Sequence, residues 1–190
     1  MRKQHRRILS LEEMVLFALF GVIMYLSAQI DIIPNVHPLG LFIVAFTAVY
    51  RFKALIPLYL YVFLEGLMGG FNLWWYPYLY LWTVLWLLCM LVPRRIPEVA
   101  AGVIFAVLTT LHGLGFGLLY APFQCYVLFD GDWQATWVWL LNGLTFDVLH
   151  AIGNFATALL AIPLIRLLCR LQRTTYPYRK CFFRQQKNHP

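Results

Sequence analysis

The chain has 190 residues, of which 62% are hydrophobic, 17% aromatic and only 12% charged. A soluble domain has roughly 45–50% apolar and about 25% charged residues, so the composition excludes a water-soluble globule. It also excludes a disordered chain, which needs low hydrophobicity and high charge. The formal net charge of +7 would suit a nucleic-acid-binding protein, but the positions of the basic residues favour an integral membrane protein of one compact domain.

The apolar residues are grouped into stretches long enough for transmembrane helices, each of which needs about 20 mostly apolar residues. Charged residues, Pro or Gly interrupt these stretches, so the sequence predicts an all-α integral membrane protein, a compact bundle of six transmembrane helices. The predicted spans are residues 11–30, 36–50, 54–70, 76–93, 98–121 and 136–166. The second is short, so it would begin in the proline-containing segment before it or lie in thinned bilayer. Residues 1–170 would form this membrane domain, and residues 171–190 a basic cytoplasmic tail.

The basic residues predict the orientation of these spans. All 15 Lys and Arg residues lie in the two terminal segments and in the loops after the second and fourth spans. The alternate loops contain none, and they carry Asp31, Asp130 and Asp132. Because loops rich in Lys and Arg stay in the cytoplasm, we predict a multi-pass protein of the cell membrane with both termini cytoplasmic. The basic tail would be attracted to anionic lipid, and we expect no nucleic-acid partner.

Polar side chains inside the predicted spans are the strongest indication of a site. Ionisable groups there cost on the order of 2.5–3.5 kcal/mol each on insertion scales and commonly mark functional cavities. The candidates are four ionisable residues and two amides: Glu65, His112, Asp147, His150, Asn142 and Asn154. With a rise of about 1.5 Å per residue, three separate spans bring an ionisable group to the outer half of the membrane, which predicts a shared pocket open to the outside. The alternative is that Asp147 and His150 only satisfy each other or a neighbouring helix.

Segments rich in aromatic residues, proline or glycine flank the predicted pocket. Residues 71–78 bring Asn72 and Trp75 to the outer end, where Trp and Tyr usually form the interfacial belt. A functional alternative is an aromatic wall or lid over a flat ligand, with Asn72 supplying a hydrogen bond. Residues 31–38 are either a proline-stiffened turn or a gate over the site. The alternate glycines of residues 113–117 allow close approach of a ligand or of another helix.

The chemistry of these residues suits binding better than catalysis. The sequence has no nucleotide-binding glycine loop, no His-Glu-x-x-His and no Gly-x-Ser-x-Gly, so we predict no catalytic residues, no cofactor and no resident metal. The four cysteines have no metal-site spacing and form no obvious disulfide. No Lys or Arg lies near the predicted pocket, so we expect a neutral or cationic, flat heterocyclic ligand. Glu65 or Asp147 would pair with its amine, and aromatic side chains would cover its faces.

Four runs of the sequence carry a resemblance to a known family. They are PNVH (34–37), FLEGL (63–67), GFNLWW (70–75) and FDVLHAIGNF (146–155). These runs resemble the substrate-binding S components of energy-coupling factor (ECF) transporters, in particular a clostridial-type group, over roughly residues 10–170. The resemblance implies a six-helix protein that captures a vitamin-like molecule from outside and docks on a transmembrane coupling subunit driven by two ATPase subunits.

The resemblance also implies where the coupling subunit would dock. In that family, small residues of the first helix, often Ala-x-x-x-Ala, face the coupling subunit. Here Ala18 and Gly21 would take this place, although Val22 stands at the fourth position after Ala18 and departs from the pattern. Two alternatives remain: an MreD-like membrane scaffold without an outer pocket, and an intramembrane metalloenzyme that uses Glu65, His112, Asp147 and His150.

Overall fold

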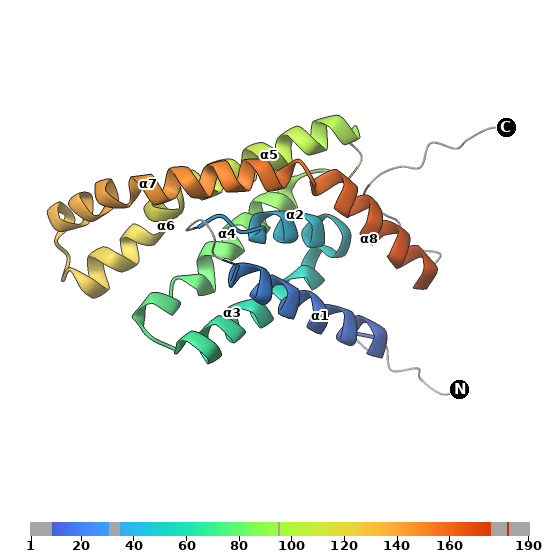
Figure 1. The fold of residues 1–190 in the computed structure, drawn as a ribbon, viewed down its shortest axis with the longest axis horizontal. Helices are drawn as coiled ribbons and strands as arrows, with labels where there is room; N and C mark the ends of the chain where they lie inside the picture. Colours follow the sequence, from blue (N-terminus) through green and yellow to red (C-terminus); the bar gives the residue numbers. More distant parts are fainter. Residues whose placement is uncertain (1–8, 31–34, 95, 176–181, 183–190) are drawn as a thin grey trace.

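The computed structural model describes residues 9–30, 35–94, 96–175 and 182, and every regular element within them is a helix. Figure 1 shows the arrangement of these helices. In chain order they are α1 (Leu11–Ala28), α2 (Leu39–Tyr50), η1 (Arg51–Ala54), α3 (Leu55–Gly69), η2 (Leu73–Trp75), α4 (Tyr78–Leu91), α5 (Glu98–Leu114), α6 (Phe116–Phe123), η3 (Gln124–Leu128), α7 (Trp133–Ala158) and α8 (Ala161–Thr175). The prediction of an all-helical protein is confirmed for the described residues.

The short helix α2 forms the centre of the bundle. Of its 12 residues, 11 are buried, and it packs mainly against α4 and α8, with further contacts to α1, α5 and α7. A helix that is apolar on all sides is expected in such a position, because each of its faces then removes apolar surface from water or lipid. The helix ends at Tyr50, and the next residue, Arg51, has a φ of 55° and a ψ of −120° that redirect the chain before α3.

The start of α1 is fastened to the turn between α2 and α3. The Ser10 side chain accepts the Glu13 N–H at 3.1 Å, and the Glu13 carboxylate accepts the Ser10 N–H at 3.2 Å, which forms a capping box. The same carboxylate, which is buried, lies 2.7 Å from Lys53 Nζ of η1. On the other side of η1, Arg51 Nη2 donates to the Met90 carbonyl at 2.5 Å. Polar contacts thus hold three helices together at this end of the bundle.

Two of the longer helical stretches are bent. α5 and α6 meet at 44°, with Gly115 between them, and α7 and α8 meet at 51°. α5 and α7 form the most extensive helix pair of the structure and run side by side (Figure 1). This crossing is close because Gly113 has no side chain: a Cβ there would lie 2.8 Å from Asn154 Nδ2 and 3.0 Å from the Ala151 backbone nitrogen.

Several helices are long and apolar enough to cross a membrane. Among the described residues these are Leu11–Ala28, Leu39–Gly69 and Leu73–Leu91, and the two bent pairs raise the number to five if each counts as one span. This supports a membrane protein, while the finer count of six spans stays a prediction. The predicted boundaries lie within three residues of the observed helix ends in the first four spans.

The end of the chain differs from the predicted tail. α8 continues to Thr175, so the expected boundary at residue 170 falls inside a helix. Phe182, within the predicted tail, is buried and its ring centroid lies 5.7 Å from that of Phe105 in α5. The expectation about the cysteines is wrong for Cys169, which is disulfide-bonded, whereas Cys89 and Cys125 are free and buried.

Candidate functional site

Five rings from five segments of the chain meet in the interior; we call them the ring cluster. They belong to His37, Trp82, His112, Phe116 and His150. The His150 ring centroid lies 5.0 Å from that of Phe116, 5.4 Å from that of His37 and 6.2 Å from that of Trp82. Trp82 in turn lies 5.7 Å from His112 and 5.3 Å from Phe116. Such separations are typical of interacting aromatic rings, each pair contributing about 0.5–1.5 kcal/mol beyond area burial.

Helix geometry explains why these rings converge. His112 stands near the end of α5 and Phe116 is the first residue of α6, so the bend at Gly115 lets both point to the same place. The segment before α2 lies close against α7 at Gly153, where an added Cβ would lie only 3.0 Å from a side-chain carbon of Val36. This close approach brings His37 to His150. Trp82 completes the cluster from the middle of α4.

Three ring nitrogens in this cluster are buried without a hydrogen-bond partner. They are Trp82 Nε1, His112 Nδ1 and His150 Nε2, on side chains that are 1%, 4% and 2% exposed. The other nitrogen of His112, Nε2, lies 3.0 Å from the Leu81 carbonyl oxygen. Because buried polar groups are nearly always hydrogen-bonded, three unsatisfied nitrogens in one place indicate a site that is completed by another molecule.

Asp147 lies beside the cluster but has a partner on the backbone. Its two carboxylate oxygens accept the Gly117 N–H, at 3.2 Å and 3.1 Å. Gly117 is in the first turn of α6, where the N–H groups have no partner within the helix. The contact matches the alternative in which Asp147 satisfies a neighbouring helix, because Asp147 of α7 caps α6.

Asn154 lies at the crossing of α2, α5 and α7. Its amide Nδ2 donates to the Thr109 carbonyl at 3.1 Å, while its Oδ1 is buried without a hydrogen-bond partner. A Cβ at Gly40 would lie 2.7 Å from this oxygen. Asn154 therefore joins three helices one turn along α7 from His150.

Glu65 belongs to a neighbouring polar group. Gln29 Nε2 donates to its carboxylate at 3.2 Å, and the hydroxyl group of Tyr61 forms a second hydrogen bond with it. The Tyr61 ring is buried and lies 6.2 Å from Trp82, measured between centroids. Glu65 is half-buried. It is connected to the ring cluster through Tyr61 and through Tyr78, whose ring lies 6.0 Å from that of Trp82.

The other predicted ligand-binding residues lie away from the cluster. Trp75 Nε1 donates to the Val62 carbonyl at 2.7 Å, so the indole lies on α3. Asn72, just before η2, is exposed, and so is Asn142 in α7. The structure therefore brings His112 and His150 together with Asn154 beside them, and it adds His37, Trp82 and Phe116, which the site prediction did not include.

The two residues expected to contact a coupling subunit have different environments. Ala18 is exposed on α1. Gly21 is buried against α3, where an added Cβ would lie 2.7 Å from a Leu60 side-chain carbon. The small residue at Gly21 thus permits the packing of α1 on α3, and Ala18 is the one of the pair that a partner could reach.

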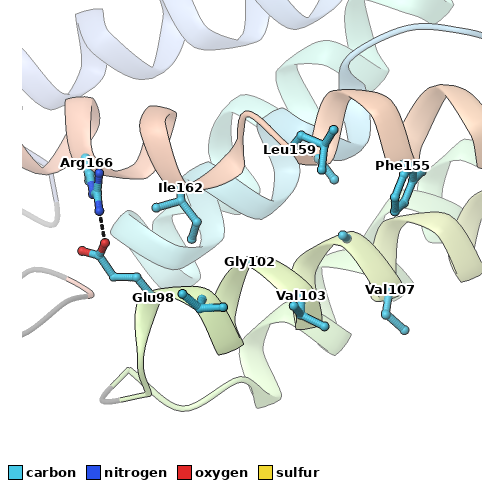
Figure 2. A pocket seen from close by; sticks show the side chains of 11 residues that line it. Glu98, Gly102, Val103, Val107, Phe155, Leu159, Ile162 and Arg166 are labelled. Carbon is cyan, nitrogen blue, oxygen red and sulfur yellow. Dashed lines mark hydrogen bonds and ion pairs between the residues drawn. The ribbon is translucent and has the colours of Figure 1, made fainter.

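A second concave feature, an open groove of about 470 Å³, runs between α5 and the bent pair α7–α8. Figure 2 shows its apolar lining, which includes Val103, Phe155 and Leu159, and the Glu98–Arg166 ion pair that closes one end. Apart from this ion pair its lining is almost wholly apolar. Such a surface is compatible with lipid, and it lacks the convergent polar groups that orient a small ligand.

Among the residues that the structure describes, no three His, Cys, Asp or Glu side chains converge on a point where they could hold a metal ion. His112 and His150 turn to the ring cluster, while Asp147 and Glu65 are engaged elsewhere. Comparison of the chain with protein-family models, curated proteins and solved structures gives no match. The ring cluster is therefore the best-supported candidate site.

Proposed function

We propose that the protein is the substrate-binding S component of an ECF-type ABC importer. It captures a vitamin-like or heterocyclic micronutrient from outside and passes it to a separate, ATPase-driven coupling module. The observation that carries this proposal is the ring cluster with its three unsatisfied, buried nitrogens. A binding protein needs a place of this kind, with apolar ring faces and a few polar atoms that fix orientation.

The bend between α5 and α6 gives the proposal a second support. In many membrane transporters the binding site is formed where a helix is broken, because the freed backbone groups and the residues at the break are available for ligand. His112 and Phe116 flank the break at Gly115, and Asp147 holds the α6 side of it. The ring cluster therefore lies at the interruption that a transporter would use.

The arrangement of the loops supports the proposed topology of six spans with cytoplasmic termini. The start of α1, η1, the α4–α5 connection and the end of α8 lie toward one end of the bundle, on the right in Figure 1. η2 and the α6–α7 connection, which carries Asp130 and Asp132, lie toward the opposite end. Basic residues thus gather at the end that would face the cytoplasm.

The proposed partners are a transmembrane coupling subunit and two ATPase subunits. The exposed face of α1 includes Ala18 together with Met14, Leu19 and Val22. An apolar, exposed helix face can contact another membrane protein without loss of hydrogen bonds. A substitution of Ala18 by Trp would obstruct this contact while leaving the ring cluster, on other helices, unchanged.

Native mass spectrometry of the protein purified from its own cells in mild detergent tests the proposal. We expect a single retained small molecule and co-purification of a coupling subunit with two ATPase subunits. The His150→Phe variant keeps a ring but lacks the nitrogen, and it should lose the small molecule while retaining the partners. Ala18→Trp should have the opposite effect. A protein that holds no small molecule and binds no coupling subunit would contradict the proposal and favour a membrane scaffold.

A further inference from the structure

We propose that the ring cluster binds a neutral, planar molecule through an edge on which a hydrogen-bond donor stands beside an acceptor, as in a lactam. Trp82 Nε1 would donate to the carbonyl of this edge, and His112 Nδ1 would accept its N–H. The inference rests on the proposed function and specifies the substrate class of that site. It follows from the hydrogen-bonding capacity of the two atoms, from the rings around them and from the charges nearby.

The roles of the two nitrogens follow from their chemistry. An indole nitrogen carries a hydrogen and can only donate. In His112 the Leu81 carbonyl, 3.0 Å from Nε2, can only accept, so Nε2 carries the hydrogen. In the neutral imidazole the remaining nitrogen, Nδ1, then has a free lone pair and accepts. The cluster therefore offers one donor and one acceptor on rings whose centroids lie 5.7 Å apart.

The surrounding rings favour a planar ligand. Phe116 is half-buried and lies 5.3 Å from Trp82 and 5.9 Å from His112, measured between centroids. Its neighbour His150 lies 5.0 Å from it and leaves Nε2 as a further unsatisfied nitrogen. Because Phe116 is only half-buried, a rotation of its side chain, with the start of α6 held in place, would separate its ring from the cluster and admit a flat molecule.

The nearby charges favour a neutral ligand over a cation. Asp147 accepts the Gly117 N–H on both oxygens, and Glu65 is bound by Gln29 and Tyr61. Each carboxylate is thus engaged by neutral donors outside the ring cluster, and neither belongs to the cluster itself. Among the described residues, the rings around the three nitrogens belong to Trp, His, Phe and Tyr side chains, since Tyr61 and Tyr78 also contact Trp82. None of these side chains is Lys or Arg, so an anionic ligand would find no such partner among them.

Binding of matched probe pairs to the detergent-solubilised protein tests the inference. Pyridone and hypoxanthine carry the lactam edge, whereas N-methylpyridone and N1-methylhypoxanthine have lost its donor. We expect the two lactams to bind and to raise the melting temperature, and the methylated probes to bind more weakly by about tenfold or more, because His112 Nδ1 then stays unsatisfied. Equal binding within each pair, or no binding of either lactam, would overturn the inference and would leave a fixed water as the partner of these nitrogens.

Two tryptophan variants distinguish the effect of losing the Trp82 N–H donor from the general effect of replacing an indole ring in α4. Trp82→Phe removes the indole N–H of the cluster and should weaken lactam binding by about tenfold or more. Trp86→Phe is the control in the same helix, because Trp86 Nε1 already donates to the Arg51 carbonyl at 3.2 Å; its lactam affinity should be unchanged. If Trp82→Phe does not fold, the ¹⁵N NMR spectrum of the histidine side chains in the wild type provides the test. The signal of the lone-pair nitrogen of His112 should move on addition of lactam. An unchanged signal would contradict the proposal.

Failure of this inference and failure of the proposed function give different results. If the protein co-purifies with a coupling subunit and ATPases but binds no lactam, the importer stands and the substrate class is wrong. If it binds lactams but assembles with no such subunits, the substrate class stands and the importer is wrong. Absence of both would overturn both.

Discussion

Asp147 of α7 accepts the backbone N–H of Gly117 on both carboxylate oxygens, 3.2 Å away at Oδ1 and 3.1 Å at Oδ2. Gly117 is the second residue of α6, and a carboxylate at a helix N-terminus is favoured both by the unpaired N–H groups and by the helix dipole. The contact fixes where α6 begins and hence where Phe116 stands in the ring cluster. Asp147 therefore acts on the site as a positioning residue.

The loss of stability on substitution of Asp147 should depend on whether the new side chain still offers a hydrogen-bond acceptor to Gly117. Asp147→Ala leaves the Gly117 N–H without its acceptor and should lower the free energy of unfolding by about 1–3 kcal/mol. Asp147→Asn keeps a carbonyl oxygen and should cost clearly less. Denaturant unfolding in mild detergent measures both changes. If Asp147→Asn were as costly as Asp147→Ala, the negative charge and not the hydrogen bond would be the important feature.

Gly117→Ala tests the same contact from the other side. An added Cβ would lie 2.5 Å from Asp147 Oδ2, so the carboxylate must move away from the helix. We expect Gly117→Ala to destabilise the protein, and the double variant Gly117→Ala/Asp147→Ala to cost less than the sum of the single variants, since contacting residues are coupled by about 0.5–3 kcal/mol. Simple additivity would show that the two residues act independently.

Two glycines on adjacent helices should respond in opposite ways to the same change. A Cβ at Gly113 would meet Asn154 and the α7 backbone at 2.8–3.0 Å, whereas a Cβ at Gly143 would meet nothing within 4 Å. Gly113→Ala should therefore cost about 1–3 kcal/mol through overpacking. Gly143→Ala should stabilise α7 by about 0.5–1 kcal/mol, because Gly is the weaker helix former. Thermal unfolding compares them, and a similar effect at both positions would contradict the close α5–α7 crossing.

The sequence was sufficient to predict most helix positions because charged residues interrupt long apolar runs. The breaks near Arg51 and Pro93 fall where such residues occur, and the structure has its helix ends there. The bends within the fifth and sixth predicted spans could not be predicted in the same way. Gly115 lies inside an uncharged stretch, and a glycine there is compatible with a straight helix, a bend or close packing. Only the packing of α6 on α7 decides between them.

Two residues of the candidate site, His112 and His150, are among those predicted from the sequence. Depth along a helix suggested that His112 and His150 lie at a common level, and the structure brings them into one cluster. The depth of a residue along its helix does not show how far it lies from residues of other helices. Asn72 and Asn142 were therefore included among the predicted ligand-binding residues, although both are exposed. Trp82 was missed because it stands in a uniformly apolar helix, where an aromatic residue is expected in the core. Its unsatisfied N–H is a property of the packed structure and leaves no signal in the sequence.

Two ion pairs at the ends of helices should contribute unequally to stability. Glu13→Gln keeps an acceptor for the capping box but removes the charge that Lys53 Nζ faces at 2.7 Å. Because Glu13 is buried and Lys53 is partly so, we expect a loss of about 3 kcal/mol, the lower end of the range for a buried pair. Glu98→Gln removes the exposed pair with Arg166 and should give no measurable change. Equal losses in denaturant unfolding would contradict this distinction.

Glu65 provides the sharpest test between a neutral and a cationic ligand. If its carboxylate paired with a ligand amine, Glu65→Gln would abolish binding. In the structure that carboxylate is held by Gln29 and Tyr61, and the ring cluster lies beyond the Tyr61 ring. We therefore expect Glu65→Gln to leave lactam affinity within about threefold of the wild type. This change is smaller than the effect of one lost hydrogen bond. Parallel titrations of the wild type, Glu65→Gln and Trp82→Phe measure this. A large loss in Glu65→Gln with little change in Trp82→Phe would show that the ligand is a cation bound at the Glu65 side of the bundle.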